Sequence, residues 1–240
     1  MYAEADDATG ASEEALPTHR RLQVEFLALG LADAPGRRLL DFGCSGGFYM
    51  TAARELGLEA SGVEYDAEYS QRVARAVGLP VTTLDRLEAE RPAPFDIIHV
   101  GHVLEHVAAP AALVRRLMPL AQPTTLWLFD GPLENNRCLS RFVIDIGSRL
   151  KRRPYQEIEP QHLSATTARA QRDFFERLGF TALRFEIREQ AWPLPETFPG
   201  WSPALLGRFA LARVSIGLSR WLPGCGNLFH FAGRRGVPAV

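Results

Sequence analysis

The stretch RLLDFGCSGG, residues 38–47, decides how this sequence folds. It begins as a short apolar run and ends as a glycine-rich turn, which is the pattern of a buried strand followed by a tight loop. Glycine lets the backbone come within contact distance of a ligand at the carboxyl end of a parallel strand. A helix is predicted next, from Phe48 to Leu56, because Gly57 can end it.

Strands and helices alternate along the rest of the chain. The predicted strands are Arg38–Phe42, Ala60–Glu64, Val81–Leu84, Phe95–Val100, Thr124–Phe129, Thr181–Arg188 and Asn227–Ala232. The predicted helices are Thr18–Leu31, Phe48–Leu56, Asp66–Val77, Pro110–Leu117, Leu139–Leu150, Thr166–Leu178 and Ala204–Trp221. Because the strands read as continuous apolar runs between helices, the sequence predicts an α/β fold with a mostly parallel sheet covered on both faces.

The composition narrows the class of protein. The chain has 240 residues, 46% of them hydrophobic, which fits one large domain. Its 27 basic and 28 acidic side chains nearly balance, so no nucleic-acid partner is expected. The 3 cysteines match no metal-binding spacing and favour a reducing compartment. Since no export signal and no membrane-spanning run is found, a cytoplasmic location is predicted.

The turn after the first strand carries a family resemblance. Asp41, Gly43 and Gly47 fit the pattern Asp/Glu-x-Gly-x-Gly-x-Gly, with Ser45 in place of the middle glycine. This loop resembles the nucleotide loop of class I S-adenosylmethionine-dependent methyltransferases. The resemblance implies a Rossmann-like, doubly wound sheet with an antiparallel last strand, and S-adenosylmethionine as the cofactor.

The resemblance also gives the segments their roles. Residues 1–16 are acidic and polar and are predicted to be a flexible tail. Residues 17–240 are expected to form a single methyltransferase domain. Within it we expect a cofactor-binding core over 36–134, a lid or acceptor-binding insertion after the fifth strand over 135–165, and the end of the sheet with a basic, apolar helix over 166–240.

Acidic side chains are predicted to bind the cofactor. Glu64 ends the second strand about 20 residues after the first glycine, where a carboxylate can accept both ribose hydroxyls. Asp41 would offset the ammonium of the methionine portion. A nicotinamide-binding loop, Gly-x-Gly-x-x-Gly, fails at Ser45 and Phe48. The full predicted cofactor set is Asp41, Gly43, Cys44, Ser45, Gly47, Glu64, Tyr65, Asp85 and Gly101.

Histidines are the predicted catalytic residues. The segment FDIIHVGHVLEHV, residues 95–107, resembles the family's fourth motif and places His102 and His106 near the reacting centre. His102, Glu105 and His106 have i, i+3 and i+4 spacing and could hold a metal, but bracing of the loop is favoured and no metal is predicted. His162, in a loop before the helix over 166–178, could remove the acceptor's proton, or could close the pocket instead.

The predicted reaction is methyl transfer by in-line displacement to a small-molecule or glycan-type acceptor, with oxygen favoured by analogy. One alternative is a protein that binds S-adenosylmethionine without turnover, as a scaffold or regulator. Another is a methyltransferase of a quinone or lipid-linked intermediate at a membrane surface, since arginines alternate with apolar residues over 137–153 and 204–221.

Overall fold

The computed structural model describes residues 36–139, 142, 146, 162–189, 202–219, 221–222 and 224–236. The predicted acidic tail and the helix predicted over Thr18–Leu31 lie outside the described residues. So does most of the insertion predicted over 135–165, including the helix predicted over Leu139–Leu150 apart from three of its positions.

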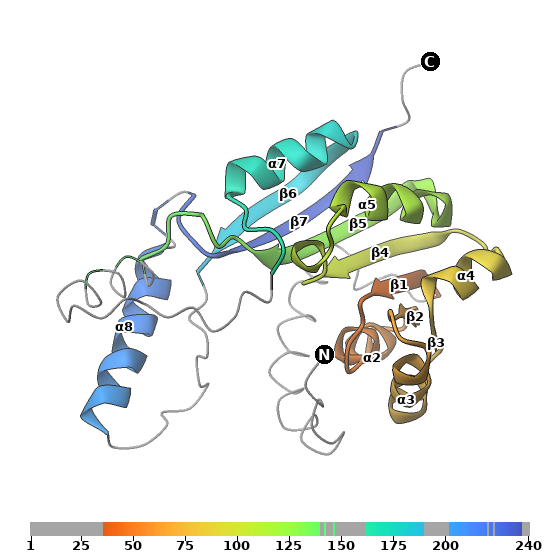
Figure 1. Ribbon diagram of the computed structural model, residues 1–240, viewed down its shortest axis with the longest axis horizontal. Coiled ribbons are helices and arrows are strands. Elements are labelled where there is room, and N and C mark those ends of the chain that lie inside the picture. Colours follow the sequence, from red (N-terminus) through yellow and green to blue (C-terminus); the bar gives the residue numbers. More distant parts are fainter. Residues whose placement is uncertain are drawn as a thin grey trace. The chain divides into compact units, whose positions relative to one another are not determined.

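The strands form one seven-stranded sheet in the order β3-β2-β1-β4-β5-β7-β6 (Figure 1). They are β1 (Arg38–Phe42), β2 (Glu59–Val63), β3 (Val81–Thr82), β4 (Phe95–Gly101), β5 (Ala121–Pro132), β6 (Phe180–Arg188) and β7 (Leu228–Arg235). The β1–β2, β1–β4 and β2–β3 pairs are parallel, whereas β6 and β7 are antiparallel. The predicted mostly parallel sheet with an antiparallel last strand is therefore confirmed.

Helices connect most of these strands. The described α-helices are α2 (Phe48–Glu55), α3 (Ala67–Val77), α4 (Leu84–Glu90), α5 (Pro110–Leu117), α7 (Ala168–Arg177) and α8 (Pro203–Ser219). Single 3-10 turns occur at η1 (Leu104–His106) and η2 (Met118–Leu120). Among the described helices, none is long and apolar enough to cross a membrane.

The chain divides into two compact units. Among the described residues, the first unit holds 36–103 and 112–128, and the second holds 104–111 and everything from Phe129 onward. The first unit therefore contains β1 to β4 with α2 to α4, and the second contains α7, α8, β6 and β7.

The core of the first unit lies on β1 and β4. Leu39 and Leu40 are adjacent in β1, and Ile97 and Ile98 are adjacent in β4, yet all four are fully buried. Burial of consecutive residues requires apolar cover on both faces of the sheet, which is the arrangement expected of parallel strands.

The core of the second unit is aromatic. Phe175 of α7 stacks on Phe231 of β7 with ring centroids 4.2 Å apart, and Phe129 lies 4.7 Å from Phe175. Phe180, at the start of β6, meets Phe129 edge-on at 5.6 Å. Burial of a side chain of this size stabilises a fold by about 1.5–3 kcal/mol, so these ring contacts stabilise the packing of α7 against β6 and β7.

The predicted C-terminal end of the third strand is wrong. The strand predicted over Val81–Leu84 stops at Thr82, and Leu84 begins α4. Leu84 and Leu87 are buried one turn apart on α4, so their apolar pattern belongs to a helix face and not to a strand.

Candidate functional site

The loop after β1 has a backbone that only small residues can adopt easily. Gly43 and Gly47 both have φ near +76°, in the left-handed region. A Cβ on Gly43 would lie 2.4 Å from Cγ2 of Val103, and one on Gly47 would lie 2.8 Å from Cγ1 of Val77. Both glycines are therefore required by backbone geometry and by close packing.

Ser45 occupies the position where the family pattern has glycine. Its φ is +45°, also in the left-handed region, and its side chain is exposed. A non-glycine residue in this region is strained, which explains the family's preference for glycine here. The serine therefore keeps the turn that the glycine pattern predicts.

The carboxylate of Glu64 holds this strained loop. Its Oε1 accepts a hydrogen bond from the Ser45 amide at 2.5 Å, and its Oε2 accepts one from the Tyr65 amide at 3.3 Å. The two segments meet because β1 and β2 run parallel, with Phe42 beside Val63 in register. The structure thus brings together the loop and the acid that the sequence analysis selected separately.

Burial raises the pKa of the Glu64 carboxyl above its usual value. The amides of Ser45 and Tyr65 lower the pKa, and the nearby Asp41 raises it further. Glu64 is therefore a carboxyl whose charge is costly in the free protein, and additional hydrogen-bond donors from a ligand would stabilise its ionised form.

Asp41 lies deeper than the sequence suggested. It is 2% exposed, and its Oδ1 lies 2.7 Å from Nδ1 of His99. The His99 ring stacks on Tyr49 of α2 at 3.6 Å with an interplanar angle of 3°. The sequence analysis missed His99, although Asp41 and His99 are partners in the parallel register of β1 and β4. A polar pair at matched positions of two adjacent predicted strands was the available signal.

Cys44 is a packing residue in this loop. Burial raises the pKa of its thiol, and the acidic side chains of Asp41 and Glu64 raise it further. Its Sγ would lie 2.7 Å from a Cβ on Gly62, so a side chain at position 62 has no room. The Cys44 thiol is therefore inert, and a contribution to ligand binding would come from its backbone.

The other predicted cofactor residues are placed differently. Gly101 ends β4, beside the carboxyl end of β1. The Tyr65 side chain is 98% exposed. Asp85 lies in the first turn of α4 and forms an ion pair with Arg116, which Glu88 also binds. Of Gly101, Tyr65 and Asp85, only Gly101 and the backbone amide of Tyr65 lie beside the glycine-rich loop.

The second unit brings two of the predicted catalytic histidines together. The rings of His106 and His162 meet edge-on with centroids 4.7 Å apart. Nδ1 of His162 is hydrogen-bonded to a carboxylate oxygen of Glu134, an acid that the sequence analysis did not select. The amide of Leu163 donates to the carbonyl oxygen of Glu105 at 2.7 Å and fixes this loop to η1. The histidine–carboxylate pair is an arrangement that suits a general base.

His102 does not belong to this group. It has φ of +52° and lies in the first unit, directly after β4. The helical face proposed for His102, Glu105 and His106 does not form, because residues 104–106 make only a single 3-10 turn. Ligand atoms of Glu105, His106 and His162 instead lie within 4.8 Å of one another, so this different set could hold a metal ion.

Comparison with known proteins identifies the family. A family model described as a methyltransferase domain matches residues 16–184. A ubiquinone biosynthesis O-methyltransferase from Bordetella pertussis is 34% identical over 109 residues, which are 42% of this chain and 44% of that protein. The match therefore spans less than half the length of this curated relative.

Solved structures share the fold at low sequence identity. A methyltransferase from Archaeoglobus fulgidus, described as dependent on S-adenosylmethionine, has a TM-score of 0.58 and 14% identity, over 90% of this chain and 94% of that one. Another S-adenosylmethionine-dependent methyltransferase, from Mesorhizobium loti, has a TM-score of 0.55 and 19% identity, over 95% of this chain and 100% of that one. Because this family model matches more than half of the chain, the chain belongs to the family described as a methyltransferase domain, and it shares the fold of these S-adenosylmethionine-dependent methyltransferases.

Proposed function

We propose that this protein transfers a methyl group from S-adenosylmethionine to a hydroxyl of a small-molecule acceptor. The observation that carries the proposal is the hydrogen bond between the Glu64 carboxylate and the Ser45 amide, which sets an acid beside a glycine-rich loop. A carboxylate at this position can accept the two ribose hydroxyls of an adenosine-containing ligand. Asp41 disfavours a dinucleotide, because a carboxylate beside the loop would repel its pyrophosphate.

The loop residues suit this cofactor. Gly43, Ser45 and Gly47 have left-handed backbones, and the small residues of this loop let the chain come close to a ligand. Asp41 contributes negative charge for the methionine ammonium, directly or through water. Asp85 is the weakest member of the proposed cofactor set, because Arg116 already pairs with its carboxylate.

When bound, S-adenosylmethionine supplies a sulfonium methyl that is already activated. The cofactor would supply this methyl group to the acceptor oxygen by in-line displacement, with S-adenosylhomocysteine as the product. We assign the proton of the hydroxyl to Nε2 of His162. Its Nδ1 faces Glu134, so a proton on Nδ1 leaves Nε2 as the acceptor. His106, in edge contact with His162, would help to position that ring, whereas His102 is a separate candidate beside Gly101.

Oxygen and a small molecule are favoured by the relatives, which are described as ubiquinone biosynthesis O-methyltransferases. A glycan-type acceptor is the alternative from the sequence. We also propose a cytoplasmic location, since among the described residues none of Cys44, Cys138 and Cys225 is in a disulfide.

A second candidate is the same reaction at a membrane surface. Val214 and Leu218 of α8 and Trp221 just beyond it are more than half exposed. These apolar side chains lie in a part of the sequence that contains arginines and no acid after Glu196. Sedimentation with anionic liposomes at low salt tests this version, and protein that stays in the supernatant would exclude it.

Calorimetry of the pure protein with S-adenosylhomocysteine tests cofactor binding, with NAD as the comparison. We expect binding of the first compound and none of the second. Incubation with radioactive S-adenosylmethionine and fractionated cell extracts then tests turnover. Binding without label transfer to any fraction would favour the scaffold alternative, and absence of binding would contradict the proposal.

A further inference from the structure

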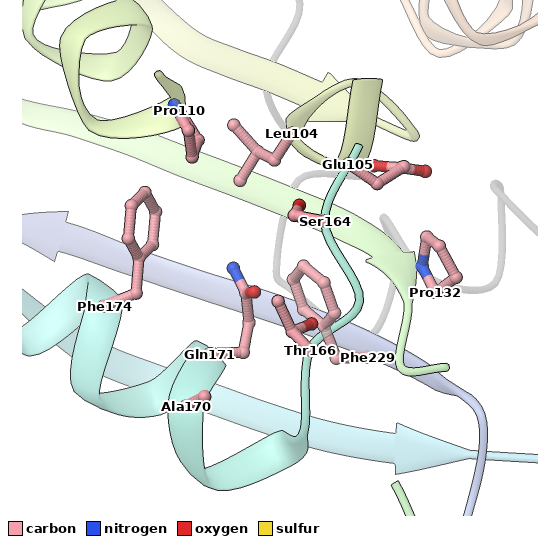
Figure 2. A pocket seen from close by; sticks show the side chains of 10 residues that line it. All are labelled: Leu104, Glu105, Pro110, Pro132, Ser164, Thr166, Ala170, Gln171, Phe174 and Phe229. Atoms are coloured by element: carbon pink, nitrogen blue, oxygen red, sulfur yellow. The ribbon is translucent and has the colours of Figure 1, made fainter. Parts of the chain in front are cut away.

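A pocket of about 180 Å³ lies in the second unit, next to the histidine–carboxylate pair described above, because Glu105, whose carboxylate is within 4.8 Å of His106 and His162, forms part of its wall. Its walls are mainly apolar and include Leu104, Pro110, Phe174 and Phe229. Figure 2 shows these side chains surrounding a space that α7 faces. The residues come from η1, α5, α7 and β7, so packing of the second unit builds the pocket without the glycine-rich loop.

A polar side chain points into this pocket. Gln171 of α7 is only 5% exposed, and Figure 2 shows its carboxamide directed into the space between Phe174 and Phe229. Among the described residues, no hydrogen bond or ion pair engages this carboxamide, although its backbone amide donates to Thr167 in the helix. The amide atoms of Gln171 are open to the pocket and are not enclosed by protein, so their hydrogen bonds are available to water or to a bound molecule. The Gln171 carboxamide therefore marks a position for a ligand.

Size limits the ligand to one ring. An apolar cavity of about 150 Å³ holds a benzene molecule, so a pocket of about 180 Å³ accepts one six-membered ring with a small substituent. Phe174 and Phe229 supply aromatic walls that a flat ring can contact by stacking or edge-on.

Charge and hydrogen bonding further restrict the chemical class of the ligand. The Gln171 carboxamide both donates and accepts, so it suits a group that does the same, such as an amide, a lactam or a phenol. The acidic side chain of Glu105 is also on the pocket wall, and it is 6% exposed. A carboxylate at this depth repels an anionic ligand, because screening by water is weak there.

We propose that this pocket binds an uncharged six-membered ring bearing one amide-like or phenolic group, with Gln171 as the residue that selects the group. The inference goes beyond the proposed methyl transfer and does not rest on it. Binding is to be measured without S-adenosylmethionine, so either idea can fail while the other stands.

Benzamide is the probe, and benzoate, of the same shape but anionic, is its counterpart. We expect calorimetry and ligand-observed NMR to show one molecule of benzamide bound per chain, and benzoate bound at least about tenfold more weakly. Gln171→Leu should weaken benzamide by about tenfold or more, since the ligand's polar group would lose its partner.

Two further variants complete the test. Ala170→Trp fills the pocket from an exposed position, so it should abolish benzamide binding and leave the fold intact even where Gln171→Leu does not fold. Gln71→Leu, at an exposed glutamine of α3, is the matched control and should bind benzamide like the wild type. Absence of benzamide binding to the wild type, or equal binding by the wild type and both pocket variants, would overturn the proposal.

Discussion

Removal of the Glu64 side chain is the sharpest test of the proposed cofactor site. In the free protein its two carboxylate oxygens accept amide hydrogen bonds at 2.5 and 3.3 Å. In the complex the same oxygens would also face two ribose hydroxyls. A hydrogen bond to a charged group contributes about 1.5–3 kcal/mol. With about 1.4 kcal/mol for each factor of ten, loss of even one of these two bonds in Glu64→Ala should weaken S-adenosylhomocysteine binding at least about 10- to 100-fold.

The pH dependence adds an independent check. Burial raises the pKa of Glu64 in the free protein, while ribose donors would favour its ionised form. Affinity should therefore fall as the pH is lowered through that raised pKa, and the decline should begin at a higher pH than for an ordinary glutamate. Glu64→Gln keeps the shape without the titration, so its affinity should be reduced and insensitive to pH over the same range.

Titration calorimetry between pH 5 and 8 measures both effects. Glu59→Ala is the matched control, because Glu59 is an exposed acid at the other end of the same strand. Far-ultraviolet circular dichroism confirms that each variant is folded. Wild-type affinity in a folded Glu64→Ala protein would refute the placement of the ribose at this carboxylate.

Three other outcomes are expected. Gly62→Ala should lower the free energy of unfolding by about 1–3 kcal/mol in urea titrations, because the new Cβ would lie 2.4 Å from Sδ of Met50. Gly217→Ala, with open space around it, is the control and should be neutral or stabilising. For Glu186, burial tends to raise the pKa, but hydrogen bonds from two arginines lower it overall, so its stabilisation is present above the usual glutamate pKa and lost as the pH falls through the lowered value. Glu186→Gln should therefore melt at a lower temperature at pH 7 and like the wild type in acid; a constant difference would contradict this. His162→Ala should lower kcat about 100-fold or more with S-adenosylhomocysteine binding unchanged, and a chelator that abolishes wild-type turnover would point to a metal role for this residue instead.

Local sequence patterns predicted most of the strands and helices of the fold. The run from Arg38 to Gly47 gave the first strand, its loop and the start of α2, and Pro110 opens α5 at the predicted residue. These features depend on neighbours in the chain: apolar runs, a glycine stop and a proline at the first helical position. The same reasoning missed α4, because Leu84 continues the apolar run of β3 while it packs as a helical residue.

The candidate site was harder to predict, because its contacts join distant segments. His99 reaches Asp41 through the register of two strands, and Glu134 reaches His162 across the segment that separates β5 from α7. Neither pairing has a spacing that periodicity can detect. The roles assigned to the loop, to Glu64 and to the histidines remain predictions, and the acceptor depends on a pocket chemistry that no local motif encodes.

The strand order carries a consequence for synthesis of the protein. β7 is the last strand along the chain, yet it lies between β5 and β6. While the ribosome is still translating the segment after Arg188, β6 therefore lacks β7, the strand with which it pairs in the finished sheet. A nascent chain at this stage exposes an unsatisfied strand edge next to phenylalanine-rich surface, which is the kind of intermediate that aggregates or recruits chaperones. Completion of this half of the sheet has to wait until residues 228–235 have left the exit tunnel.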